Sequence, residues 1–400
     1  MIVGIDGSED VVINAEGLGD RVFDIEAGAD VTISNLTITG GEADIGGAID
    51  NDGALIVSQS TFIDNSANNG GAIANAGTLT VSQSTFIGNS ANIGGDTLTS
   101  GGAIDNAGTL TVSQSTFIDN SSDFAGGAIA SSGVLTVSES IFIDNSSDVG
   151  GGAIAIRGTA EVIESLFINN SAGLVGGAIE NAGALTVIDS TFIANSAVEG
   201  GAINNYAGPI EDGSYLSGTL EVIDSVFVAN SAVEGGAINN YASLLEDGSY
   251  LLGTLTIIGS VFENNSAANY GGAIYNEGVA TVSESYFKDN WVNDGGGAIA
   301  NSGVVVISQS IFAGNSASEG GAINNQDGVA LVSDSTFVLN SAENGGAINN
   351  TGGLEVSDST FVVNLATGDG GAIVSDSEIA LVLLGENVFK KNQPDDIFLA

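Results

Sequence analysis

The chain has 400 residues, no cysteine, no histidine and a formal net charge of −44. A surface this acidic repels phosphate backbones and anionic lipid headgroups, which argues against nucleic acids and anionic membranes as partners. The composition also excludes disulfides, thiolate metal sites and histidine-based catalysis, and no apolar run is long enough to predict a transmembrane helix.

Residues 1–45 are expected to form an N-terminal cap and the first coils of a repeat structure. The opening Met1-Ile2-Val3-Gly4 lacks the basic and apolar regions of a signal peptide, so no export signal is visible in this chain.

Two motifs in fixed phase dominate residues 46–385. Gly-Gly-Ala-Ile occurs thirteen times, and nine of its twelve intervals are 24 or 25 residues. Phe-x-x-Asn also occurs thirteen times, from Phe62 to Phe389. Such regularity predicts a solenoid, in which a single unit cannot bury its apolar side chains and stacked units can.

One unit, residues 70–91, shows the strand pattern. Leu79, Val81 and Phe86 are apolar, and Thr80 and Ser82 alternate with the first two, which is the period of a strand. The glycine pairs leave no room for a helix of ordinary length. We therefore predict an all-β fold, a single-stranded right-handed parallel β-helix (a solenoid) with about 14 coils of 24–25 residues.

Equivalent residues should lie above one another in such a stack and form internal ladders. The expected aromatic ladder and the first members of the expected amide ladder are Phe62, Phe86, Phe117, Phe142, Phe167, Phe192, Phe227, Phe262, Phe287, Phe312, Phe337, Phe361, Asn65, Asn89, Asn120 and Asn145. Asparagine can donate and accept along the axis and tolerates left-handed backbone, and paired glycines permit bends where a Cβ would clash.

The alternation of Gly-Gly-Ala-Ile with Phe-x-x-Asn resembles the repeat of the chlamydial polymorphic outer membrane proteins. The resemblance covers roughly residues 46–392. It implies a pectin-lyase-like β-helix and an adhesin exported as an autotransporter passenger, located outside the cell or on its surface in association with the outer membrane. This chain departs from that pattern after the repeats, because residues 386–400 are expected to form only a C-terminal cap or tail.

Two consecutive coils carry near-duplicate insertions, and all seven tyrosines and the single tryptophan fall between residues 206 and 291. Insertions in a solenoid emerge on one face, often the binding face, and aromatic rings beside acids suit sugars. The candidate ligand-binding residues are Tyr206, Glu211, Asp212, Tyr215, Tyr241, Glu246, Asp247, Tyr250, Tyr275 and Trp291. The alternative is a self-packed pair of loops that arose by coil duplication.

Catalysis has weaker support in the sequence. Lyases of this fold class resemble one another in using a basic residue, and this chain has only Arg21, Arg157, Lys288, Lys390 and Lys391. Carboxylate pairs could serve a glycosidase, but acids are so frequent that pairs arise by chance. Calcium could bind along the acidic faces, although no dedicated metal site can be named and no other cofactor is expected.

We therefore predict a non-catalytic surface scaffold, monomeric and adhesin-like. Its protruding loops around residues 206–291 would bind carbohydrate or a protein of a host or neighbouring cell. A polysaccharide lyase or hydrolase is the first alternative, and a purely structural surface spacer is the second.

Overall fold

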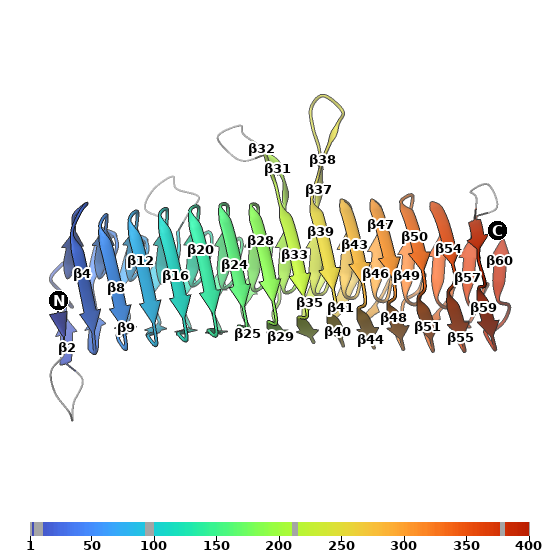
Figure 1. Ribbon diagram of the computed structural model, residues 1–400, viewed down its shortest axis with the longest axis horizontal. Helices are drawn as coiled ribbons and strands as arrows, with labels where there is room; N and C mark the ends of the chain where they lie inside the picture. The colour runs from blue at the N-terminus through green and yellow to red at the C-terminus, as the bar shows by residue number, and fades with distance from the viewer. Residues whose placement is uncertain (1, 4–10, 93–99, 210–214, 377–380, 400) are drawn as a thin grey trace. The chain divides into compact units, whose positions relative to one another are not determined.

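The computed structural model describes residues 2–3, 11–92, 100–209, 215–376 and 381–399. The chain divides into two compact units, Met1–Ser190 and Thr191–Ala400. Every regular element in the described ranges is a β-strand. Within each unit the strands pair in parallel with their counterparts one coil away (Figure 1), so the predicted parallel β-helix is confirmed.

The first unit contains three sheets and a short fourth ladder. The long sheet consists of β1 (Ile2–Val3), β4 (Asp30–Ser34), β8 (Ala54–Ser58), β12 (Thr78–Ser82), β16 (Thr109–Ser113), β20 (Val134–Ser138), β24 (Thr159–Ile163) and β28 (Ala184–Ile188). The phenylalanine sheet consists of β2 (Val11–Asn14), β5 (Leu36–Thr39), β9 (Thr61–Ile63), β13 (Thr85–Ile87), β17 (Thr116–Ile118), β21 (Ile141–Ile143) and β25 (Leu166–Ile168).

The other two ladders of the first unit flank the glycine pairs. The isoleucine sheet follows each pair and consists of β3 (Phe23–Ile25), β7 (Ile49–Asn51), β11 (Ile73–Asn75), β15 (Ile104–Asn106), β19 (Ile129–Ser131), β23 (Ile154–Ile156) and β27 (Ile179–Asn181). The short ladder precedes each pair and consists of β6 (Glu42–Ile45), β10 (Ser66–Asn69), β14 (Ser90–Ala91), β18 (Ser121–Ser122), β22 (Ser146–Ser147) and β26 (Ser171–Ala172).

The second unit repeats this arrangement. Its long sheet consists of β33 (Thr219–Ile223), β39 (Thr254–Ile258), β43 (Val279–Ser283), β47 (Val304–Ser308), β50 (Val329–Ser333), β54 (Gly353–Ser357) and β58 (Leu381–Leu384). Its phenylalanine sheet consists of β29 (Thr191–Ile193), β34 (Val226–Val228), β40 (Val261–Glu263), β44 (Tyr286–Lys288), β48 (Ile311–Ala313), β51 (Thr336–Val338), β55 (Thr360–Val362) and β59 (Val388–Lys390).

The remaining strands of the second unit include those nearest the insertions. The isoleucine sheet consists of β30 (Ile203–Asn205), β36 (Ile238–Asn240), β42 (Ile274–Asn276), β46 (Ile299–Asn301), β49 (Ile323–Asn325), β53 (Ile348–Asn350), β57 (Ile373–Ser375) and β60 (Ile397–Leu399). Short ladders join β35 (Ser231–Glu234), β41 (Ser266–Tyr270) and β45 (Trp291–Val292), and join β52 (Ser341–Ala342) to β56 (Leu365–Ala366).

Register places identical motif residues opposite one another. Phe117 lies opposite Phe142, and Ile129 lies opposite Ile154. Side chains alternate between the two faces of a strand, so a slip of one residue would expose every phenylalanine, and the apolar pattern therefore selects this register. The phenylalanines from Phe62 to Phe361 are fully buried. The Phe117 and Phe142 rings stack at 4.8 Å between centroids with 4° between their planes.

In the coil around Phe117, two corner residues other than glycine have left-handed backbone. Gln114 has φ 48° and Asp119 has φ 52°, and each stands directly before a buried ladder residue, Ser115 or Asn120. At these corners a side-chain oxygen of the next coil accepts the backbone hydrogen bond, as Asn120 N–H donates to Asn145 Oδ1 at 3.1 Å. The serine and asparagine columns thus satisfy backbone groups that the bend withdraws from the sheets.

The glycine pair is required by close backbone approach. Gly70 has φ 64°, and a Cβ there would lie 2.3 Å from the Ile73 carbonyl oxygen. A Cβ on Gly71 would lie 2.1 Å from the carbonyl oxygen of Gly102 in the next coil. Only glycine fits both positions without displacing the coil above.

Truncating one phenylalanine of the aromatic stack should destabilise the fold far more than truncating the residue that follows it in the sequence. We expect Phe142→Ala to lower the free energy of unfolding by about 3–5 kcal/mol, because it leaves a cavity between Phe117 and Phe167. Ile143→Ala, at a half-buried position, is the control and should cost clearly less. Urea unfolding followed by circular dichroism measures both, and equal losses would contradict a packed aromatic column.

The amide ladder can be tested separately. Asn145→Ala removes the acceptor of the Asn120 N–H and the donor to the Phe117 carbonyl, which lies 3.0 Å from Asn145 Nδ2. Each orphaned group should cost about 1–3 kcal/mol. Asp144→Asn is the matched control, because asparagine also tolerates the φ of 54° at that corner. A midpoint in urea unchanged by Asn145→Ala would refute the role of the ladder.

Candidate functional site

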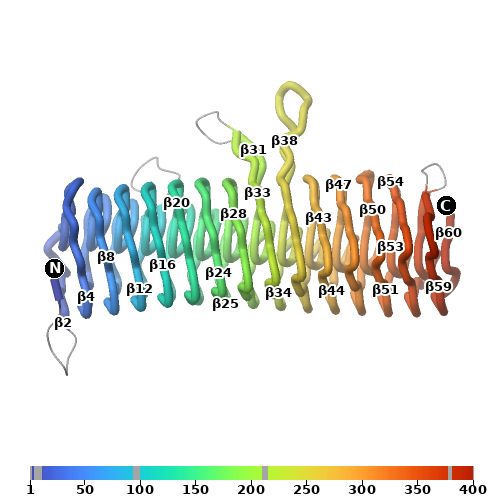
Figure 2. The backbone as a smooth tube through the Cα atoms, viewed as in Figure 1, coloured from blue at the N-terminus to red at the C-terminus, as the bar shows by residue number. Residues whose placement is uncertain are grey.

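The two predicted insertions form antiparallel hairpins in the second unit. The first pairs β31 (Ala207–Pro209) with β32 (Tyr215–Ser217), and the second pairs β37 (Ala242–Leu244) with β38 (Tyr250–Leu252). Both project from the edge of their coils (Figure 2). Tyr215 and Tyr250 lie on the returning strands, β32 and β38, and are 52% and 64% exposed.

The acids of the second hairpin form a turn at its tip. Asp247 accepts hydrogen bonds from the Ser249 backbone N–H at 2.9 Å and the Ser249 hydroxyl at 2.6 Å, and these bonds lower its pKa. Glu246 is exposed beside it. Glu211 and Asp212, the corresponding candidates of the first hairpin, lie outside the described residues. The described tip is therefore a locally satisfied turn, and the cavity lies below it.

A groove of about 520 Å³ lies at the base of the second hairpin. We call it the hairpin groove, and it is lined by Ala242, Tyr250, Leu252, Glu277, Gly278, Ser302, Gly303, Val304, Asp327, Gly328 and Val329. These residues come from the hairpin and from three successive coils that follow it. Its volume lies in the range typical of small-molecule and sugar-sized sites, roughly 300–1,000 Å³.

One wall of the hairpin groove is apolar. Tyr250 and Leu252 contribute from β38, and Val304 and Val329 face each other across the β47–β50 pair with 37% and 44% of their surfaces exposed. A Cβ on Gly303 of the floor would lie 2.1 Å from the Gly278 carbonyl oxygen. At Gly303 the groove is therefore lined by backbone atoms and not by a side chain.

Two of the residues that line the hairpin groove are acidic, Glu277 and Asp327. Glu277 accepts hydrogen bonds from the Tyr275 hydroxyl at 3.2 Å and from the Ala242 N–H at 3.4 Å, which ties it to the hairpin base. Asp327 is exposed at φ 58°, in a coil with one more residue before its corner glycine than its neighbours have. The groove thus combines an apolar face with carboxylate acceptors, an arrangement that suits a polyhydroxylated ring.

Glu277 belongs to a cluster of three half-buried glutamates. Burial raises the pKa of Glu199, and the like charges of Glu234 and Glu277 raise it further. Burial is also the main cause of the raised pKa of Glu234 and of Glu277. Asn239 Nδ2 donates to Glu199 at 3.3 Å. The described side chains thus hold these acids close together without a cation to neutralise them.

Tyrosine rings surround the cluster. Tyr206 and Tyr241 stack at 5.8 Å, and Tyr270 and Tyr275 stack at 5.6 Å. Burial raises the pKa of Tyr241, and the charge of Glu277 adds to the shift. The structure therefore brings Tyr206, Tyr241 and Tyr275 to the base of the hairpins. Trp291 lies apart from them on β45, which pairs with β41.

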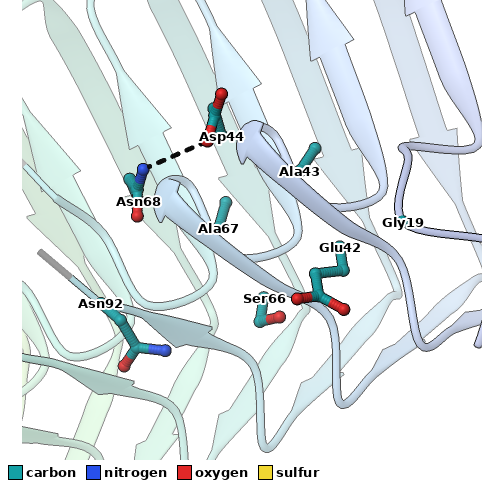
Figure 3. A pocket seen from close by; sticks show the side chains of 8 residues that line it. All are labelled: Gly19, Glu42, Ala43, Asp44, Ser66, Ala67, Asn68 and Asn92. Atoms are coloured by element: carbon teal, nitrogen blue, oxygen red, sulfur yellow. Dashed lines mark hydrogen bonds between the residues drawn. The ribbon is translucent and has the colours of Figure 1, made fainter. Parts of the chain in front are cut away.

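A second groove of about 370 Å³ lies in the first unit, over β6 and β10 (Figure 3). In the close-up, Asn68 donates to Asp44 at 3.5 Å, and the Glu42 and Ser66 side chains lie near each other on the same two strands. None of the described residues that line it carries an aromatic ring. It lacks the apolar wall that the hairpin groove has.

Among the described residues, no group of three or more carboxylates is arranged to hold a metal ion. Within the same residues, no helical segment has the length and apolar character needed to span a bilayer.

Sequence reasoning missed the acids of the hairpin groove and of the glutamate cluster beside it. Glu199 and Glu234 stand directly before the glycine pair in the two duplicated coils, and Val-Glu-Gly-Gly-Ala-Ile-Asn-Asn-Tyr is identical in both. That identity was the available signal for this pair. The extra residue before Gly328 was the signal for Asp327. Glu277 follows an ordinary coil pattern and could be found only from the fold.

Three segments, residues 59–76, 139–157 and 259–277, match the Chlamydia polymorphic membrane protein repeat. The resemblance that the two motifs indicated is therefore confirmed for the repeat. No curated protein is similar to this chain in sequence.

Solved structures of similar architecture include phage tailspikes and alginate lyases. A mutant tailspike protein of E. coli bacteriophage HK620 in complex with a pentasaccharide is 11% identical with a TM-score of 0.44, over 92% of this chain and 73% of that chain. Tailspike protein 3 of bacteriophage CBA120 is 11% identical with a TM-score of 0.32, over 98% and 56%. A PL6-family alginate lyase is 9% identical with a TM-score of 0.27, over 96% and 86%.

The first unit also holds a half-buried acid whose titration should be visible in stability. Burial raises the pKa of Asp105 to about 6, although Asn69 donates to it at 3.4 Å. The folded state therefore binds this proton more tightly than the unfolded state does. Its contribution to stability is complete below the unfolded pKa and is lost as the pH rises through about 6.

Asp105→Asn should remove this pH dependence. At neutral pH the variant should gain about 2–3 kcal/mol of unfolding free energy, and near pH 4 the gain should vanish. Thermal unfolding at the two pH values measures the difference. The exposed Asp148→Asn serves as control and should leave the profile unchanged. A wild-type stability that does not fall between these pH values would contradict the assignment.

Proposed function

We propose that this chain is a non-catalytic scaffold of the cell surface or extracellular space that binds carbohydrate in the hairpin groove. The observation that carries the proposal is a single groove whose lining combines the apolar Tyr250 and Leu252 with the carboxylates of Glu277 and Asp327. A pyranose ring has apolar faces and a rim of hydroxyl donors. The apolar wall can pack on a face while the carboxylates accept from the rim.

The surrounding solenoid supports this role. Parallel ladders hold the floor rigidly, and the hairpin is anchored at its base, where the Tyr241 carbonyl accepts from the Gly253 N–H at 3.0 Å. A rigid site loses little conformational entropy on binding. The match to the polymorphic membrane protein repeat is consistent with a surface location and an adhesive role.

A polysaccharide-active enzyme is the second candidate, and the glutamate cluster favours it. A carboxyl group whose pKa is raised by burial, as that of Glu277 is, can act as a general acid. The binding assay can separate the two functions if it also detects cleavage of the glycan. New reducing ends or unsaturated products that disappear in Glu277→Gln would replace the binding proposal with the enzymatic one.

Tyr250→Ala should weaken glycan binding by about 1–3 kcal/mol, which is roughly fivefold to 150-fold in Kd, because it removes the exposed ring of the apolar wall. A glycan array followed by calorimetry on the best ligand measures this. Trp291→Ala is the matched control. That side chain is also aromatic and 48% exposed, but it lies on β45 and does not line the hairpin groove.

The control variant should bind like the wild type. If Tyr250→Ala binds as tightly as the wild type, the hairpin groove is not the site. If no glycan binds to the intact chain, the proposal fails and the spacer interpretation replaces it.

A further inference from the structure

The hairpin groove carries one sign of charge. Its two charged lining residues, Glu277 and Asp327, are both acidic, and none of the described residues that line it is basic. Two of the five bases of the chain are paired in other coils, Arg21 with Asp50 and Lys288 with Glu263 at 2.5 Å. The groove therefore offers negative charge that no described side chain neutralises.

The acid cluster beside the groove receives neutral side-chain donors. Asn239 donates its Nδ2 to Glu199 at 3.3 Å, and the Tyr275 hydroxyl donates to Glu277 at 3.2 Å. These donors carry no charge, so they do not neutralise the negative charge of the ionised acids.

An adjoining groove continues the same chemistry. A hollow of about 220 Å³ is lined by Tyr270, Asp294, Gly295, Ser318, Glu319, Asn324 and Gln326. Gln326 lines this hollow, and the next residue, Asp327, lines the hairpin groove. Both cavities combine a tyrosine with two carboxylates. A polymer that follows the surface from one to the other would meet four acids.

We propose that the glycan bound here carries free amino groups, so that a deacetylated amino-sugar polymer spans the hairpin groove and the adjoining hollow. This inference rests on the proposed carbohydrate binding and names its ligand class. A protonated amine supplies three donors and a positive charge, which matches the carboxylates of both cavities. Acetylation removes the charge and leaves one N–H, and a uronate or sulfate would be repelled.

The test compares glucosamine oligosaccharides with N-acetylglucosamine oligosaccharides of equal length, at a pH below the pKa of the sugar amine. Calorimetry on the full chain should give an affinity about tenfold or more higher for the free amine. Added salt should reduce the difference, because it screens the charges. Equal affinity, or tighter binding of the acetylated oligomer, would overturn the inference.

The double variant Glu277→Gln with Asp327→Asn isolates the charge. The amides keep the size of the side chains, and asparagine tolerates the φ of 58° at position 327. The preference for the free amine should fall to about twofold or less, while binding of the acetylated oligomer changes little. Glu355→Gln on β54, outside both cavities, is the control and should retain the preference.

The outcomes distinguish a failure of the amino-sugar inference from a failure of the proposed carbohydrate binding. Binding of both oligomers with no preference retains the carbohydrate site and rejects the amino-sugar ligand. Failure of both to bind, together with every other glycan, rejects the site itself. If the double variant does not fold, the comparison of the two oligomers on the wild-type chain still decides.

Discussion

The whole structure depends on in-register stacking of equivalent residues, one coil above the next. The ring spacing of 4.8 Å between Phe117 and Phe142 is also the spacing of paired strands, so one translation serves backbone and side chains together. At the corners, where the backbone cannot continue the sheet, serine and asparagine side chains replace the missing carbonyl groups. A residue that breaks this translation disturbs the coils on both sides.

The same regularity explains how a site can arise on so uniform a scaffold. A coil has little freedom inside, where the phenylalanine, asparagine and glycine positions are all determined by contacts with the next coil. Variation is tolerated at the edge between the isoleucine sheet and the long sheet, where both hairpins are inserted. The second hairpin contributes Tyr250 and Leu252 to the groove, and the coil with one extra residue contributes Asp327.

The fold could be predicted from the sequence because its signal is repeated in every coil. The glycine pairs, the buried phenylalanines and the ladder asparagines each follow from a local steric or hydrogen-bonding need. The site is different, because its parts come from separate coils and need no common motif. Tyr250 could be chosen from its insertion, whereas Glu277 becomes a site residue only when β37–β38 closes over its coil.

The acidic residues near the site also could not be identified from the sequence. With 49 acids in the chain, composition alone cannot distinguish a solvated carboxylate from one that lines a cavity. Burial and the approach of like charges single out Glu199, Glu234 and Glu277, and both depend on distances between coils. The hairpin acids Glu246 and Asp247, by contrast, drew attention by their place in the insertion, yet they belong to an exposed local turn.

The most direct test is a crystal structure of the chain soaked with the tightest-binding glycan. The account predicts sugar density in the hairpin groove, with one ring face against Tyr250 and a hydroxyl or amino group within hydrogen-bond distance of Glu277. Density elsewhere on the surface, for example against Trp291, with an empty groove would contradict it.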